Sequence, residues 1–338
     1  MSSVPDSSLL RHAIAAWLIA GFLLLFALRF HLLPGLLAGL LVYELVHIIA
    51  PRLRLAHAGA GKVAAVALLA MLIVAMLMLL FFGAMAFFRS DAGSLPALLQ
   101  KMAEIIEGSR GNLPDWVVGS LPADADSLKN TIVTWLRGHA GDVELVGREA
   151  GRTVVHILIG MVIGAMVSLR EARPGEGHGP LAHALVERAA RLGEAFRRVV
   201  FAQVRIAALN TLFTVIYLVA VLPMLGVHLP LTKTMIAITF VAGLLPVLGN
   251  LISNTVIVVV SLSASPSAAL GSLVFLVLVH KLEYFLNARI VGAQIRASAW
   301  ELLLAMLVME AAFGIPGLVA APIYYAYLKD ELAARRLI

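Results

Sequence analysis

The chain has 338 residues, of which 61% are hydrophobic and only 14% charged, and its formal net charge at pH 7 is +6. Because a soluble domain is ~45–50% apolar and ~25% charged, this composition excludes an ordinary soluble protein. The apolar runs are continuous rather than alternating, which excludes a transmembrane β-barrel, and the lack of cysteine excludes disulfides and thiolate chemistry. The sequence therefore predicts an all-α polytopic membrane protein, whose basic balance reflects topology-setting loops rather than a nucleic-acid partner.

The first half of the chain alternates apolar spans with polar segments. Three transmembrane helices are predicted within 1–88, at 13–30, 32–50 and 63–88, each long enough for a ~30 Å hydrocarbon core. The first span is expected to stay uncleaved, because no small-residue cleavage site follows it. We expect an amphipathic helical insert at 89–153, a fourth span within 154–171, and a linker with an arginine-bearing amphipathic helix at 172–205.

The loop charges orient these spans. The segment 51–62 carries a net +3, as does 170–205, whereas the insert 89–153 carries a net −2. Lys and Arg in short loops favour the cytoplasmic side. We therefore predict an extracytoplasmic insert and cytoplasmic N- and C-termini.

The second half, 206–338, is predicted to be the transport core. It contains two ordinary spans, 206–225 and 268–286, which bring the expected total to about six, and two apolar runs with internal breaks. The run 231–262 is broken at Pro246 and Gly249, and the run 302–328 at Gly314, Pro316 and Gly317.

The length of the broken runs favours re-entrant hairpins. Each arm has about 12 helical residues, so it reaches about 18 Å, roughly half the bilayer. Two such hairpins that dip from opposite faces would bring their tips together near the midplane. Full double crossings and simple proline kinks remain the alternatives. Non-helical backbone at that depth survives only in protein or beside water, and paired breaks are typical of transporter binding sites.

Polar side chains near the breaks are the candidate ligands. Asn250 and Asn254 share one helical face at the first tip and would offer neutral amides. Glu283 and Glu310 could carry protons or cations; the alternatives are an ion pair at the interface for Glu283 and a protonated, hydrogen-bonded acid for Glu310. The predicted substrate- or ion-binding residues are Asn250, Asn254, Glu283, Asn287 and Glu310, with Arg289, His280 and Asn210 as supporting residues.

No enzyme signature accompanies these residues. The sequence has no His-Glu-x-x-His, Gly-x-Ser-x-Gly or phosphate-binding glycine loop, so we predict no catalysis, no cofactor and no metal site. Without a nucleotide-binding fold, transport would run on an ion gradient or downhill.

The C-terminal motifs resemble one known family. The stretches GLLPVLGNLISN, VLVHKLEYFLNARIVG and LLLAMLVMEAAFGIPGLVAAPIYYAYLKDEL are similar to the C-terminal signature of the autoinducer-2 exporter family of bacterial membrane proteins. The matching residues are Pro246, Gly249, Glu283, Arg289, Gly292, Phe313, Gly314, Gly317 and Pro322. The chain departs from the family pattern at Asn250, His280, Ala288 and Glu310.

The resemblance implies a secondary-type transporter in the bacterial inner membrane. The family is named for export of a furanosyl signalling molecule, and some members are described as sodium–proton antiporters. It also implies a homo-oligomer, with a pentamer expected, and elevator-like movement of the hairpin region against a scaffold. We therefore carry three hypotheses: an exporter of a small polar solute, coupled to ions; a sodium (lithium)/proton antiporter; and a non-transporting membrane scaffold.

Overall fold

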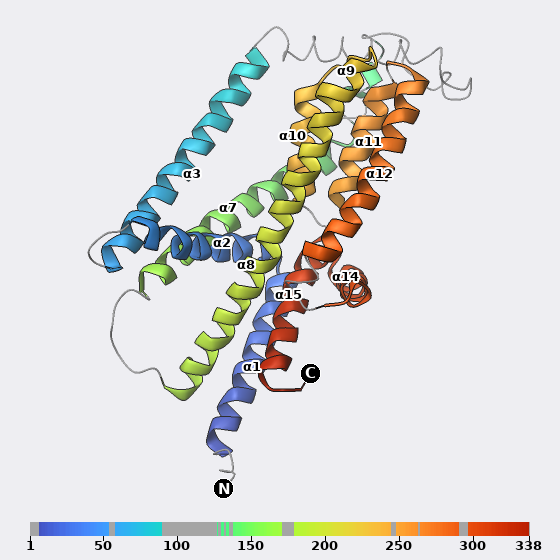
Figure 1. Ribbon diagram of the computed structural model, residues 1–338. Coiled ribbons are helices and arrows are strands. Elements are labelled where there is room, and N and C mark those ends of the chain that lie inside the picture. Colours follow the sequence, from blue (N-terminus) through green and yellow to red (C-terminus); the bar gives the residue numbers. More distant parts are fainter. Residues whose placement is uncertain are drawn as a thin grey trace. The chain divides into compact units, whose positions relative to one another are not determined.

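The described residues fold mainly into helices (Figure 1). The computed structural model describes residues 7–53, 58–89, 127, 130, 131, 133, 134, 138–170, 179–244, 248–262, 264–290 and 297–337. None of these residues forms a strand, which confirms the all-α prediction. Four helical stretches among them are long and apolar enough to cross a membrane: Arg11–Arg29, Leu33–Leu53, Ala140–Arg170 and Pro180–Met224. The chain is thus a multi-pass membrane protein, while the total of six spans stays a prediction.

The first of two compact units is assembled from three stretches of sequence, Met1–Val74, Arg148–Phe201 and Val291–Ile338. Its helices are α1 (Ser7–Arg29), α2 (Leu33–Ile49), η1 (Ala50–Leu53), the start of α3 (Ala58–Arg89), most of α7 (Ala140–Arg170), the start of α8 (Pro180–Val215), α14 (Ala299–Phe313) and α15 (Ile315–Ala334). We call it unit 1. Its largest core cluster packs Phe196 of α8 against Ile323 and Tyr327 of α15.

Helices α2 and α7 cross within unit 1 at direct backbone contact. A methyl group on Gly160 would lie 2.0 Å from the carbonyl oxygen of Gly35, and one on Gly164 would lie 2.1 Å from that of Gly39. Each helix thus presents two glycines four residues apart, the spacing that lets membrane helices approach most closely. The sequence analysis missed this crossing, although the motifs PGLLAG and GMVIG carry its signal.

The second compact unit, unit 2, comprises Ala75–Gly147 and Ala202–Ile290. Beyond the end of α8 it contains η2 (Ile216–Val221), α9 (Leu222–Met224), α10 (Thr232–Gly243), α11 (Leu248–Leu262) and α12 (Pro266–Ile290). Its core brings Tyr217, Met235, Ile257 and Leu276 together. Most of the predicted insert, residues 90–126 above all, lies outside the described residues.

The helix that begins at Pro180 continues to Met224 without interruption, through 45 residues. An amphipathic helix and a separate span at 206–225 were predicted here, and both belong to this one helical stretch. No proline occurs between Pro180 and Pro223, so nothing in between forces the backbone to break. The segment η2 is a stretch of π-helix, a local widening that often occurs at functional sites.

Candidate functional site

The first predicted break separates α10 from α11 inside unit 2. The two helices pack against each other, and Met235 and Ile257, which lie at similar distances on either side of the break, share one core cluster. The chain therefore turns back on itself as an antiparallel helix pair. The turn is tight at Gly249, where an added methyl group would lie 2.2 Å from the carbonyl oxygen of Ala242. Pro246, the predicted tip, lies outside the described residues.

Two amide side chains of α8 hold this break in place. Gln203 Nε2 donates a hydrogen bond to the carbonyl oxygen of Gly243, at 2.8 Å, where the last carbonyls of α10 lack helical partners. Seven residues further along α8, Asn210 Nδ2 donates to Oδ1 of Asn250, also at 2.8 Å. Asn210, predicted as a supporting residue, is 7% exposed and so lies in the helix interface with Asn250.

Asn254 lies one turn beyond Asn250 on α11 and is partly exposed. Among the described residues it has no hydrogen-bond partner, so its amide can still bind another group. Ser253, beside it, is buried. The two predicted amides thus differ: Asn250 is engaged with α8, and Asn254 is available.

Three buried hydroxyl groups form another polar contact inside unit 2. The Tyr217 hydroxyl lies 2.9 Å from Ser272 Oγ, which lies 2.7 Å from Ser261 Oγ. All three residues are buried, and Tyr217 projects from the π-helical segment η2. Amides and hydroxyls of α8, η2, α11 and α12 thus make separate uncharged polar contacts inside unit 2, and we call the residues that make them the polar seam: Gln203, Asn210, Tyr217, Asn250, Ser261 and Ser272.

The second predicted break, between α14 and α15, belongs to unit 1 and is formed by backbone. Gly314 has φ 65° and ψ −147°, a conformation that is essentially restricted to glycine. Gly317 is buried so closely that an added methyl group would lie 1.9 Å from the carbonyl oxygen of Met309. Pro316 occupies the first turn of α15, where proline is tolerated. Glu310, the predicted acid next to the tip, is exposed.

Charged contacts join α14 to α15 at the end remote from the break. Glu301 Oε2 accepts hydrogen bonds from Lys329 Nζ at 2.6 Å and from the Tyr325 hydroxyl at 2.5 Å. These bonds, that from Lys329 above all, lower the pKa of Glu301 to about 2. Glu301 and Lys329 lie just outside the apolar run 302–328, so this cluster closes the open end of the antiparallel pair.

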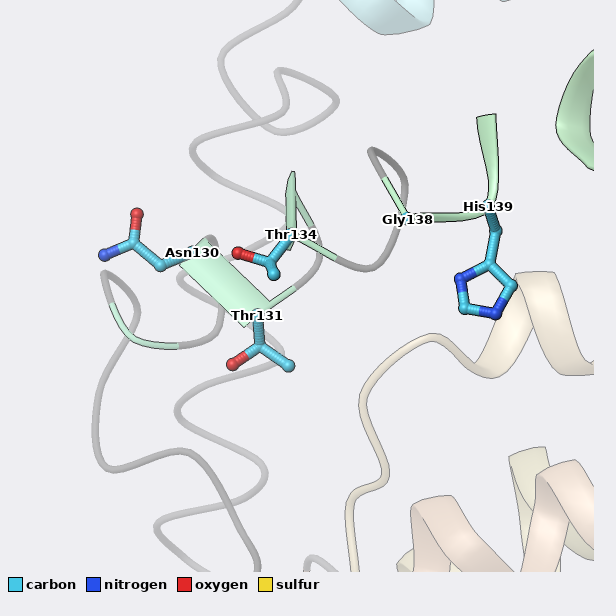
Figure 2. Close-up of a pocket in the computed structure, with 5 residues that line it drawn as sticks. All are labelled: Asn130, Thr131, Thr134, Gly138 and His139. Carbon is cyan, nitrogen blue, oxygen red and sulfur yellow. The ribbon is translucent and has the colours of Figure 1, made fainter. Parts of the chain in front are cut away.

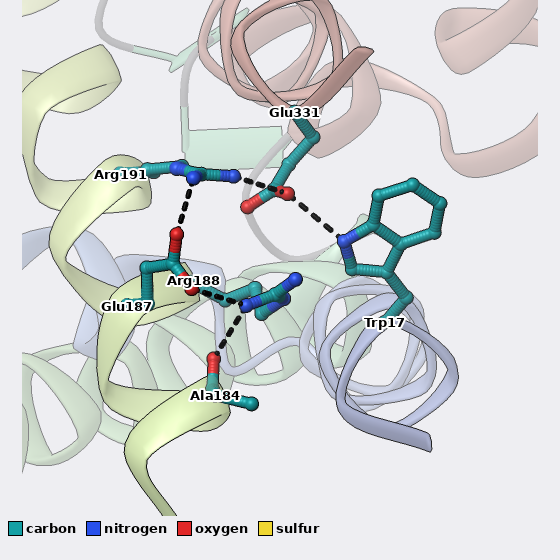
Figure 3. A network of polar contacts seen from close by, with 6 residues as sticks. All are labelled: Trp17, Ala184, Glu187, Arg188, Arg191 and Glu331. Atoms are coloured by element: carbon teal, nitrogen blue, oxygen red, sulfur yellow. Dashed lines mark hydrogen bonds and ion pairs between the residues drawn. The ribbon is translucent and has the colours of Figure 1, made fainter. Parts of the chain in front are cut away.

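A second cluster ties α15 to α1 and α8 (Figure 3). Glu331 is 4% exposed, and its Oε2 accepts hydrogen bonds from Arg191 Nη1 at 2.7 Å and from Trp17 Nε1 at 2.9 Å. Arg188 is 2% exposed, donates to the Ala184 carbonyl and pairs with Glu187. Sequence reasoning missed this cluster, because its members lie up to 314 residues apart and share no local motif.

Several predicted residues cannot be placed in the site. The side chains of His280, Glu283, Asn287 and Arg289 lie outside the described residues, although their backbone belongs to α12. Their roles stay predictions. Among the described residues no group of three or more His, Cys, Asp or Glu could hold a metal ion.

A hollow of about 580 Å³ lies in the described part of the predicted insert (Figure 2). It is lined by Asn130, Thr131, Thr134, Gly138 and His139. All five residues are exposed, and the labelled side chains spread along the segment instead of converging on one point. It therefore lacks the enclosure and convergence of a binding site.

The comparison with protein families gives one match. A family described as AI-2E family transporter matches residues 13–336, nearly the whole chain, which confirms the resemblance seen in the C-terminal motifs. Neither the comparison with curated proteins nor that with solved structures gives a match.

Proposed function

Because the chain belongs to the AI-2E transporter family, we propose that it is a secondary-type transporter that exports a small polar solute, coupled to an ion gradient. The proposal includes a homo-oligomer in the bacterial inner membrane with both termini in the cytoplasm. The basic segments 51–62 and 170–205 support that orientation.

The observation that carries the proposal is the uncharged polar seam of unit 2. Polar groups inside membrane helices are costly, and where they occur they mark pathways and binding sites. Here they lie at a helix break: Gln203 contacts the last residue of α10, and Asn210 contacts Asn250 near the start of α11. Asn254 adds an amide without a partner among the described residues.

The seam fits a neutral or weakly polar cargo better than a bare cation. Amides and hydroxyls donate and accept hydrogen bonds, and can exchange their internal partners for those of a solute. A dehydrated cation would be held more firmly by carboxylates, and the seam as defined contains none. Ion coupling then needs an acid elsewhere, for which Glu310 and Glu283 are the predicted residues.

Purified protein in liposomes tests the proposal. The probes are a labelled small sugar for solute flux, a pH-sensitive dye for protons, and sodium or lithium gradients. We expect Asn250→Ala and Asn254→Ala each to reduce solute flux about five- to thirtyfold, as loss of one or two hydrogen bonds of ~1 kcal/mol each to a bound solute predicts. Glu310→Gln should reduce coupling to protons.

Asn130→Ala, an exposed amide in the described part of the insert, is the matched control and should leave flux unchanged. Solute flux that persists in both Asn250→Ala and Asn254→Ala would reject the seam as the binding site. A sodium-dependent pH response without any solute flux would favour the antiporter hypothesis instead.

A further inference from the structure

Glu44 is a carboxyl group that the proposed site does not use. It lies on α2, inside the candidate span Leu33–Leu53, and is 7% exposed. Its neighbours on the same helix, Val42 and Val46, belong to a core cluster with Ala65 and Leu69 of α3. A buried carboxylate in apolar surroundings is costly unless it is paired or protonated.

The pairing of Glu44 is weak. Among the described residues no group donates it a hydrogen bond, and its one ion-pair contact is Arg197 Nε of α8, at 3.9 Å. The Arg197 side chain is 49% exposed, so water screens its charge. Glu194, also on α8, adds a like charge near Glu44. The α8 face opposite Glu44 thus offers one screened cation and one anion.

His47, three residues along α2, is the other ionisable group near Glu44. Its Nδ1 lies 2.8 Å from the Tyr43 carbonyl oxygen, which can only accept, so Nδ1 carries the hydrogen. Its Nε2 lies 3.4 Å from Lys62 Nζ of α3, which can only donate. Among the described residues no hydrogen bond joins His47 to Glu44.

Space is left for the carboxyl group itself. Gly193 of α8 faces it, and a methyl group there would lie 3.0 Å from Glu44 Oε1. Glu331 in the same unit provides the contrast. It is similarly buried, but its Oε2 accepts hydrogen bonds from Arg191 and Trp17, whereas no group donates one to Glu44 among the described residues.

From this geometry we propose that Glu44 is a proton-binding site, a carboxyl group that takes up and releases a proton. In the step a carboxylate oxygen of Glu44 takes up one proton from hydronium, which leaves as water, and Arg197 keeps its charge and loses its ionic partner. The inference also deepens the proposed function, on which this part rests: Glu44 is a carrier of the coupling proton, on the helix pair α2–α8.

Dicyclohexylcarbodiimide labelling tests protonation directly. The reagent enters apolar sites and takes the proton of a carboxylic acid onto one nitrogen, while the carboxylate adds to its central carbon; acyl transfer then leaves a stable acylurea. The full chain in detergent would be labelled between pH 6 and 8.5, and the modified residues identified by peptide mass spectrometry. We expect labelling of Glu44 that falls with rising pH, at least tenfold slower labelling of Glu331, and no label at position 44 in Glu44→Gln.

Arg197→Met sharpens the test. Removal of the nearest cation favours the protonated form of Glu44. Labelling of Glu44 should therefore rise about two- to fivefold at the upper end of the pH range, which is the effect expected when a half-exposed ion pair is lost. Labelling of Glu44 no faster than that of Glu331 throughout the pH range, in protein that elutes as a folded species, would overturn the proton site.

Proton flux in liposomes tests the coupling role separately. Glu44→Gln mimics the protonated acid and should abolish proton movement, while solute exchange at equal concentrations on both sides persists. Equal proton flux in wild type and Glu44→Gln would overturn the coupling role. Labelled Glu44 in a chain that moves no solute would reject the proposed function and leave the proton site standing.

Discussion

The two broken helix pairs are built in opposite ways. In α10/α11 the polar contacts converge on the break itself, where Gln203 holds Gly243 and Asn210 holds Asn250. In α14/α15 the break is formed by glycine backbone, and the polar contacts gather at the far end, around Glu301 and Glu331. Gly314 lies 13 positions after Glu301, about 20 Å along the helix.

The difference suggests that the first helix pair binds solute, whereas the second pair is held in a fixed position. Neutral amides at a break can exchange partners with a solute, so the first pair is suited to binding. Buried ionic contacts fix a helix in one position, because each partner is costly to leave alone. The second pair is therefore anchored at its open end, while backbone packing alone shapes its tip. Substitutions can test this contrast, and we give them in order of expected effect.

The largest effect should come from the ion pair between Arg191 and Glu331, which joins α15 to α8. Arg191→Met removes the cation that pairs with buried Glu331, and loss of one partner of a buried ion pair costs ~3–5 kcal/mol. We expect a loss of unfolding free energy of about 3 kcal/mol, measured by titration with denaturing detergent. Arg152→Met, whose pair with Glu149 is exposed, is the control and should change stability by less than ~1 kcal/mol.

One result would weaken this picture of the anchor. Arg188 Nε and Nη2 and Glu331 Oε1 are buried without a hydrogen-bond partner among the described residues. If Arg188 replaces Arg191 as the partner of Glu331, Arg191→Met will cost less than ~1 kcal/mol. The double variant Arg188→Met, Arg191→Met would then recover the full loss.

The tip of the second pair should show the next largest effect. Gly317→Ala places a methyl group 1.9 Å from the Met309 carbonyl oxygen, so α14 and α15 must separate locally. Overpacking of this kind costs ~1–3 kcal/mol. Gly21→Ala in α1, where an added methyl group meets nothing within 4 Å, should be neutral or stabilising. Equal stability of the two variants, measured as thermal midpoints in detergent, would show that the tip tolerates a side chain.

At the first break, stability should change less than transport. Asn210→Ala removes the donor to Asn250 Oδ1 and should cost about 1 kcal/mol of unfolding free energy. A double-mutant cycle with Asn250→Ala measures the coupling of the two side chains, for which membrane hydrogen bonds average ~0.6 kcal/mol. A coupling energy of zero would mean that the two amides act independently, which would contradict the hydrogen bond between Asn210 and Asn250.

The smallest effect should be that of the partly buried cluster at Glu301, and it should depend on pH. The contact with Lys329 lowers the pKa of Glu301 from 4.5, its ordinary value, to about 2, so the contact stabilises the protein above pH 4.5 and is lost as the pH falls toward 2. Thermal midpoints of wild type and Lys329→Met should thus differ slightly at pH 7 and converge below pH 4.5. A difference that grows as the pH falls would contradict the lowered pKa.

Prediction from sequence succeeded where the signal was local. Hydropathy identified the helices, and proline and glycine located both breaks, because only a few residues can interrupt an apolar helix. Amide spacing placed Asn250 and Asn254 on one face, and Asn210 proved to be the hydrogen-bond donor of Asn250.

The rest could not be read from the sequence, because it depends on which helices meet. Nothing near Trp17 indicates a bond to Glu331, and nothing near Tyr217 indicates its contact with Ser272. Glu310 was expected beside the tip and protonated, paired or in water; its side chain is exposed, and its role stays a prediction. Whether the two tips meet stays a prediction, since they belong to different units.

The glycine crossing of α2 and α7 has a consequence for the surrounding lipid. Because backbone touches backbone at Gly35 and Gly39, no acyl chain can enter between the two helices, and neither can slide past the other. If the bilayer becomes thinner or thicker, the two helices must change their tilt together. Glu44 lies on this same rigid pair, so membrane thickness would set the depth at which its carboxyl group exchanges protons with water.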